Sequence, residues 1–139
     1  MTRINIVPPT ELTDQHLMAE YRELAMVPSA LHRSLKTKRP FQILKEIPKE
    51  YTLNTGHVKF FYDKMGYLQY RFLQLVDELK RRNFSLDEER IERVLTQLHS
   101  VHPIFWNMWT PTEKDYNVIR QRIQQRINEK PNWYRKTVV

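Results

Sequence analysis

Apolar residues recur every three or four positions along residues 64–82, and this spacing constrains the fold more than any other feature of the sequence. The residues concerned are Leu68, Phe72, Leu75 and Leu79. A period of about 3.6 places them on one side of an α-helix, which Asp77 and Arg81 are predicted to support as an i,i+4 ion pair. No stretch of the chain alternates apolar and polar residues convincingly. The sequence therefore predicts an all-α fold.

An earlier helix is predicted to begin at residue 14. Thr13 can cap its first turn, and Asp14 supplies the negative charge that is favoured there. Its apolar face comprises Leu17, Tyr21 and Leu24. Pro28 is expected to kink or interrupt this helix, which can continue to about residue 38.

The third main helix is predicted from the segment Thr-Pro-Thr-Glu at residues 110–113. Here Thr110 would be the cap, Pro111 would lie in the first turn and Glu113 would close a capping box. The apolar face comprises Tyr116, Ile119, Ile123 and Ile127, and the helix ends before Pro131. Residues 39–56 are expected to form a long connection, and residues 83–109 leave room for one short helix around 87–99. The prediction is a compact single domain, residues 1–139, of three main helices with long irregular connections.

Composition excludes several classes of function. The chain has no Cys, which removes disulfides, thiol nucleophiles and iron–sulfur clusters, and its 2 Gly are too few for a glycine-rich phosphate loop. A formal net charge of +7 favours a polyanionic partner, most often nucleic acid. The sequence shows neither an apolar membrane span nor a signal peptide, so an intracellular protein without a membrane partner is predicted.

One face of the first helix carries three residues suited to chemistry. His16, Glu20 and Glu23 share this face, adjacent to the apolar stripe. A carboxylate there is expected to be partly desolvated, which raises its pKa and suits it to proton transfer. Gln15 and Arg22 lie on a neighbouring face. The alternative is a solvated helix with ordinary ion pairs.

Basic and aromatic residues gather toward the C-terminus. Arg122 and Arg126 stand one turn apart and could present guanidinium groups to successive phosphates. Trp133 and Tyr134 lie among Lys and Arg residues and could stack on nucleobases or wedge between them. The alternatives are a solvated basic face, and aromatic side chains that pack the C-terminus onto the core.

Other aromatic and imidazole side chains are expected to serve the fold. Trp106 and Trp109 are predicted to lie in the core. His57, His99 and His102 show no ligand pattern with carboxylates, so they are predicted to be structural or solvent-facing, and no metal site is predicted.

The chain begins Met-Thr-Arg, so removal of Met1 would leave an α-amine on Thr2. In most proteins this start has no functional consequence. An α-amine has a pKa of about 7.7–8.0 against about 10.4 for Lys, so its neutral, nucleophilic fraction at pH 7 is roughly a few hundred-fold larger. Arg3 and Arg22 are expected to lower that pKa further by charge repulsion.

Four segments of the chain resemble the pyrimidine-dimer DNA glycosylase family. They are MTRIN (residues 1–5), DQHLMAEYREL (14–24), GHVKFFYDK (56–64) and KPNWY (130–134). The resemblance runs over nearly the whole chain. It implies a compact three-helix enzyme that excises the 5′ base of cyclobutane pyrimidine dimers in double-stranded DNA and then breaks the strand by β-elimination. It also implies that no cofactor is used, that abasic sites are substrates and that the protein acts as a monomer.

The same resemblance implies roles for individual residues. The α-amine of Thr2 would be the nucleophile, forming an imine with the sugar, and Glu23 would be the essential carboxylate. The DNA-contacting positions would be Arg3, Gln15, His16, Arg22, Arg122, Arg126, Trp133 and Tyr134. Met26 departs from the pattern, because the family's phage member has an Arg there, and so does the tail WYRKTVV.

Two other readings of the sequence remain open at this point. A non-catalytic, basic helical module that binds nucleic acid would explain the charge and the aromatic residues. A metal-dependent nuclease would need clustered carboxylates, and the acidic cluster LDEER at residues 86–90 is interpreted as a helix start.

Overall fold

The computed structural model describes residues 3–139, and all the regular elements in that range are helical. The prediction of an all-α fold is confirmed. The elements are α1 (Asp14–Glu23), α2 (Met26–Ser34), α3 (Pro40–Glu46), α4 (His57–Phe60), α5 (Met65–Arg81), α6 (Glu88–His99) and α7 (Glu113–Glu129), with 3-10 turns η1 (Pro9–Glu11) and η2 (Pro103–Phe105). Across these described residues, no helix is both long and apolar enough to cross a membrane.

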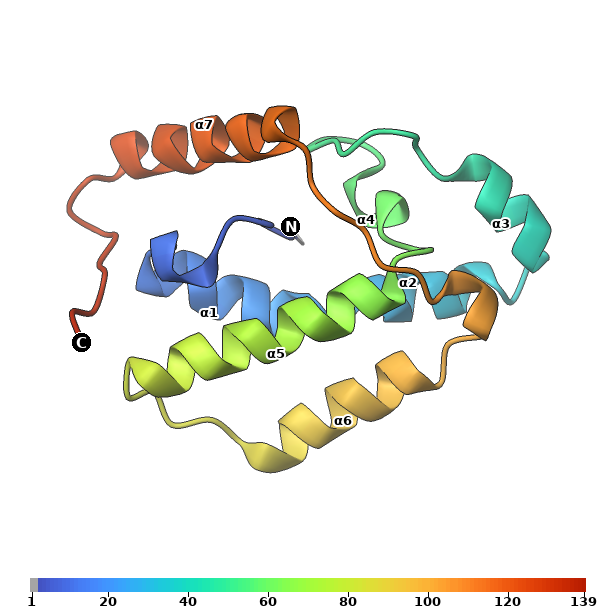
Figure 1. The fold of residues 1–139 in the computed structure, drawn as a ribbon, viewed down its shortest axis with the longest axis horizontal. Helices are drawn as coiled ribbons and strands as arrows, with labels where there is room; N and C mark the ends of the chain where they lie inside the picture. Colours follow the sequence, from blue (N-terminus) through green and yellow to red (C-terminus); the bar gives the residue numbers. More distant parts are fainter. Residues whose placement is uncertain (1–2) are drawn as a thin grey trace.

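Helix α5 runs through the middle of the fold, between α1 and α6 (Figure 1). Its observed bounds agree with the predicted range 64–82. The four apolar residues that mark it are fully buried: Leu68, Phe72, Leu75 and Leu79. Tyr21 of α1 stacks on Phe72 with ring centroids 5.6 Å apart. The predicted apolar faces of the two helices therefore meet in the core.

The ion pair predicted within α5 is wrong in one partner. Arg81 pairs with Glu78 Oε2 at 2.7 Å, and not with Asp77. Glu78 is buried and also pairs with Arg82 at 2.8 Å, whereas Asp77 is exposed. Hydrogen bonds from Arg81 and Arg82 hold the pKa of Glu78 below its usual value, against the opposing effect of its burial. Both carboxylates stand at helical spacing from Arg81, so spacing alone does not distinguish them, and the structure uses the buried one.

The first predicted helix is two helices. The break between α1 and α2 falls at residues 24–25, ahead of Pro28. Pro28 is the third residue of α2, in the first turn, where a backbone N–H has no intrahelical acceptor. A proline is therefore tolerated there, and the predicted interruption falls just before Pro28 instead of at it.

Two further corrections concern prolines. Residues 39–56 are not one long connection, because they contain α3, which has Pro40 at its first position and buries Ile43. Pro favours a helix start as well as a break, and α3 uses the first property. Helix α7 begins two residues later than predicted. Its cap is Thr112, and its capping box is closed by Asp115 instead of Glu113.

The two terminal segments converge on α1 (Figure 1). The N-terminal segment, residues 3–8, passes between α1 and α7 without regular structure. The segment after α7 returns to the start of α1, where Asp14 N–H donates to Arg135 O at 2.6 Å. Asp14 also accepts from Thr137 and from Arg82, and these bonds lower its pKa although burial acts in the opposite direction. Residues from both ends of the chain thereby lie on one face.

Candidate functional site

A pocket of about 370 Å³ lies where α1, α7 and the N-terminal segment meet. Six of the residues predicted for the site line it: Arg3, His16, Glu23, Arg122, Arg126 and Tyr134. Asn5, Ala19, Glu20, Ile119 and Ile123 complete the lining. The fold therefore brings candidate residues from three distant parts of the sequence to one concave surface. The two isoleucines were predicted only as part of an apolar helix face, because apolar spacing does not distinguish a core from a pocket wall.

The two carboxylates of the shared α1 face differ sharply in their surroundings. Glu20 is 1% exposed, and both of its oxygens accept from Arg71, at 2.6 and 2.9 Å. Glu23 is half-buried, lines the pocket, and forms no hydrogen bond or ion pair with any other residue in the range 3–139. The alternative of a solvated helix is wrong for Glu20, which belongs to a buried ion pair. Glu23 is the carboxylate that can act on a molecule in the pocket.

Three arginines concentrate positive charge around Glu23. Burial lowers the pKa of Arg3, the positive charges of Arg122 and Arg126 lower it further, and the charge of Glu23 acts in the opposite direction. Arg126 is exposed and makes a 3.5 Å contact with Glu129. Repulsion among these guanidinium groups would be relieved by an anion such as a phosphate. The pocket therefore combines a positively charged wall with one carboxylate, that of Glu23, which has no partner among residues 3–139.

The C-terminal aromatic residues take different places. The ring of Tyr134 stacks on His16, with centroids 4.7 Å apart and planes within 3°. Burial of His16 lowers its pKa, while the nearby charge of Glu20 acts to raise it. Trp133 remains 56% exposed and meets the edge of Tyr134 at 4.9 Å. Tyr134 therefore packs onto the protein, whereas Trp133 keeps an accessible aromatic surface.

Gln15 holds the C-terminal segment in place. Its Nε2 donates to Trp133 O at 2.7 Å, and its Oε1 accepts from Arg135 N–H at 2.9 Å. Both ends of the amide are therefore used within the protein. A structural partner 118 residues away could not be inferred from the spacing of Gln15 along α1.

The remaining predicted residues lie outside this pocket or outside the described range of residues 3–139. Arg22 is exposed on α1, and its carbonyl accepts from Arg90 at 3.0 Å. Met26 is 53% exposed at the start of α2. Thr2, the predicted nucleophile, is not among residues 3–139, so its expected position stays a prediction.

The side chains predicted to serve the fold do so in several cases. Trp106 and Trp109 are partly buried against the core, as predicted. His57 is 3% exposed and has hydrogen-bond partners on both ring nitrogens, so its predicted structural role is confirmed. His99 stacks on Trp106 at 5.5 Å, and His102 is exposed.

Side chains bind the backbone of the N-terminal segment, which has no neighbouring strand. Ile4 N–H donates to His57 Nε2 at 2.8 Å, and Ile4 O accepts from the Tyr51 hydroxyl at 2.8 Å. Arg3 donates to Leu53 O at 2.9 Å, and Asn5 N–H donates to Glu20 Oε1 at 3.1 Å. Buried backbone groups need such partners. The segment leading to residue 2 is consequently fixed on the pocket rim.

The buried imidazole of His57 should make folding depend on pH. Burial lowers its pKa from 6.5 to about 4; the positive charge of Arg3 adds to this effect, while the Thr52 carbonyl and the charge of Glu20 oppose it. The unfolded chain therefore binds a proton at His57 that the folded chain does not. The stabilisation is complete above the unfolded pKa and is lost as pH falls from about 6.5 toward about 4.

We expect His57 to contribute about 2 kcal/mol to the loss of unfolding free energy between about pH 7 and about pH 4.5. The free energy of unfolding in urea, measured at both pH values, tests this contribution. His16 titrates in the same direction, so the comparison is between wild type and His57→Gln, which removes only the His57 contribution. Equal pH dependence in the two proteins would show that His57 is not buried in its neutral form.

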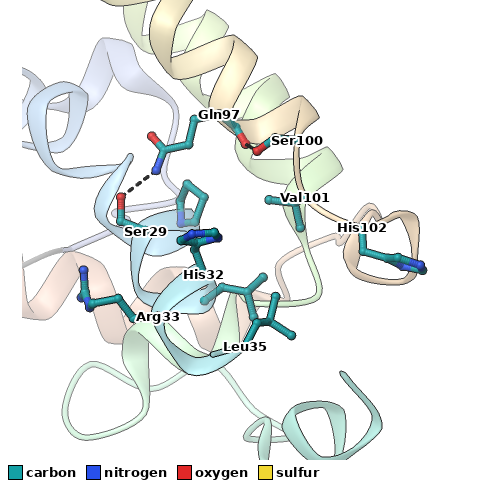
Figure 2. A pocket seen from close by; sticks show the side chains of 10 residues that line it. Ser29, His32, Arg33, Leu35, Gln97, Ser100, Val101 and His102 are labelled. Carbon is teal, nitrogen blue, oxygen red and sulfur yellow. Dashed lines mark hydrogen bonds between the residues drawn. The ribbon is translucent and has the colours of Figure 1, made fainter. Parts of the chain in front are cut away.

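A second pocket, of about 510 Å³, lies between the C-terminal ends of α2 and α6 (Figure 2). Its apolar wall includes Leu35 and Val101, and Gln97 donates across it to Ser29 Oγ at 2.6 Å. The residues that line it include neither a carboxylate nor any residue predicted for the site. Of these two pockets, the one that brings predicted site residues together is therefore the arginine-lined pocket between α1, α7 and the N-terminal segment.

A comparison with protein families identifies the class of protein to which the chain belongs. Within the described part of the chain, no three His, Cys, Asp or Glu side chains are grouped so that they could hold a metal ion. The family model for pyrimidine dimer DNA glycosylase matches residues 1–92. These residues contribute Arg3, His16 and Glu23 to the pocket, whereas α7 and Tyr134 lie beyond the match. Because the match covers about two thirds of the 139 residues, the chain belongs to the pyrimidine dimer DNA glycosylase family.

Proposed function

We propose that this protein excises the 5′ base of cyclobutane pyrimidine dimers and then nicks the strand at the resulting abasic site. The α-amine of Thr2 is the nucleophile, Glu23 is the catalytic carboxylate, and the protein acts as a monomer on double-stranded DNA. The observation that carries the proposal is the arrangement of the pocket. Its one carboxylate without a partner among residues 3–139, Glu23, lies beside Arg3, Arg122 and Arg126.

The proposed reaction begins with attack of the neutral amine on C1′ of the 5′ sugar. A bond from nitrogen to C1′ forms as the glycosidic bond breaks, and the glycosidic electron pair leaves with the base, which takes up a proton. Loss of a proton from the nitrogen and opening of the sugar ring give an imine at C1′. Removal of a proton from C2′ then moves electrons toward the 3′ phosphate, which leaves and breaks the strand.

Glu23 has two roles in this scheme. Positive charge develops on the sugar as the glycosidic bond breaks, by analogy with glycoside hydrolysis, and a carboxylate beside it stabilises that charge. The same carboxylate can then move the protons that elimination requires. The arginines of the pocket hold the flanking phosphates, and the exposed face of Trp133 is available to stack on an unstacked base.

The proposal predicts nicking of ultraviolet-irradiated duplex DNA in the presence of EDTA. Undamaged duplex of the same sequence should stay intact under these conditions. Nicking that requires added magnesium would favour a metal-dependent nuclease. Binding without nicking under either condition would leave a non-catalytic nucleic-acid-binding module as the function.

Arg126→Ala should lower the salt dependence of DNA binding by about one unit in the slope of log affinity against log salt, because one phosphate contact is lost. The loss should be similar for damaged and undamaged duplex. Arg120→Ala is the matched control on α7, since Arg120 already pairs with Glu11 at 2.8 Å. A loss confined to damaged DNA would place Arg126 at the lesion instead.

A further inference from the structure

We propose that Tyr51 and His57 are positioning residues for the reaction, because they hold both backbone polar groups of Ile4, two residues after the proposed nucleophile. This inference rests on the proposed function, because it needs the amine to be the nucleophile. Neither side chain lines the arginine-lined pocket, so neither is expected to touch DNA.

The two residues belong to one buried aromatic cluster. Their rings meet edge to face with centroids 5.5 Å apart. Tyr51 also packs on Phe60, Phe61 and Trp109, with centroids 6.0 to 6.1 Å away. Tyr51 is 7% exposed and His57 is 3% exposed. Hydrogen bonds to side chains that are packed in this way restrict the position of the Ile4 backbone.

The hydrogen bonds of His57 define its protonation. Its Nδ1 lies 2.7 Å from Thr52 O, and a carbonyl can only accept, so Nδ1 carries the proton. Its Nε2 is then free to accept from Ile4 N–H. Gly56, directly before His57, has φ of +97°, which an L side chain rarely adopts, and an added Cβ would meet Pro48 Cγ at 3.0 Å. The turn that presents His57 to Ile4 therefore depends on this glycine.

The chain beyond Ile4 is also held tightly. Val7 N–H donates to Asn5 O across a tight turn centred on Ile6, whose φ of +52° is strained for a β-branched residue. Arg71, itself paired with Glu20, donates to Val7 O. Strain of this kind persists where the surrounding structure fixes the backbone, and it is often found at functional sites.

Fixing Ile4 leaves only Arg3 between a rigid anchor and the reactive residue. The reacting atoms of such a step must come within about 3–3.5 Å of each other, and a misplacement of about 1 Å can cost roughly a hundredfold in rate. A small shift in the position of Ile4 would therefore slow imine formation. It would leave the arginines that bind phosphate in place.

The test is the single-turnover rate at which borohydride traps each variant on a duplex that contains an abasic site, measured beside the affinity for that duplex. Tyr51→Phe removes the donor to Ile4 O and should slow trapping about tenfold, with affinity unchanged within about twofold. His57→Phe removes the acceptor and should slow trapping more. His57→Gln keeps an acceptor and should recover most of the rate.

Two control variants separate positioning from general destabilisation. Val94→Ala weakens the core at α6, and Tyr21→Phe removes a buried hydroxyl that has no hydrogen-bond partner in the described structure. Both should trap at the wild-type rate below their melting temperatures. If wild type is trapped and Tyr51→Phe keeps its rate, the positioning role is overturned and the proposed function stands. If His57→Phe does not fold, Tyr51→Phe decides alone, and a wild type that is never trapped overturns both proposals.

Discussion

Glu23→Gln should slow base excision by a hundred- to a thousandfold and leave DNA binding unchanged or slightly tighter. The substitution keeps the shape of the side chain and removes its negative charge. Loss of electrostatic stabilisation for a cationic transition state costs on the order of 3–4 kcal/mol. Binding should not suffer, because a negative charge is removed from a surface that contacts phosphates.

The measurement for Glu23 is paired. Single-turnover excision from a dimer-containing duplex reports the chemistry, and equilibrium affinity for the same duplex reports binding. Glu92→Gln, on the exposed face of α6, is the matched control for loss of one negative charge elsewhere, and it should excise at the wild-type rate. Excision by Glu23→Gln within tenfold of wild type would remove Glu23 from the mechanism. Weak binding with normal excision at saturation would make it a structural residue.

Blocking the α-amine of Thr2 should abolish both excision and strand cleavage. Protein that retains Met1 carries its α-amine on Met1, one residue before Thr2, and the nitrogen of Thr2 is then an amide without nucleophilic character. DNA affinity should persist, because the pocket arginines are unchanged. The mass of the N-terminal peptide distinguishes the two forms, and the activity of each form is then compared.

A second pair of proteins tests whether the backbone amine or the threonine side chain matters. Thr2→Ser should remain active, because Ser is also small enough for Met1 to be removed and leaves an α-amine in the same place. Selective reductive methylation of that amine should inactivate both proteins. Full activity in protein shown by mass to retain Met1 would exclude the α-amine of Thr2 as the nucleophile.

The helices that the sequence predicts best are those with a long apolar repeat. Helix α5 lies within one residue of its predicted bounds at each end, because four fully buried residues repeat along it. The prediction of a long connection leaves out helix α3, since the helix is short and Pro40, at its first position, is equally typical of a connection. The start of α7 was displaced because capping patterns occur at both residue 110 and residue 112, and the side-chain geometry favours the second.

The candidate site could be predicted as a set of residues but not as a geometry. Spacing along α1 places Glu20 and Glu23 on one face. It cannot show that Arg71, 51 residues away, forms an ion pair with Glu20. The same limit applies to Gln15, whose partners belong to the C-terminal segment. The choice of Glu23 came from the family resemblance. The structure adds that Glu20 is taken by an ion pair with Arg71, which leaves Glu23 as the pocket carboxylate without a partner among residues 3–139.

Borohydride trapping during turnover is the most direct test of the proposed chemistry. Wild-type protein is mixed with a dimer-containing duplex in EDTA, the imine is reduced, and the protein–DNA adduct is digested and mapped by mass. We expect a single adduct on the N-terminal peptide, at the nitrogen of Thr2. An adduct on a lysine side chain, or nicking without any adduct, would contradict a mechanism that passes through an imine at the N-terminus.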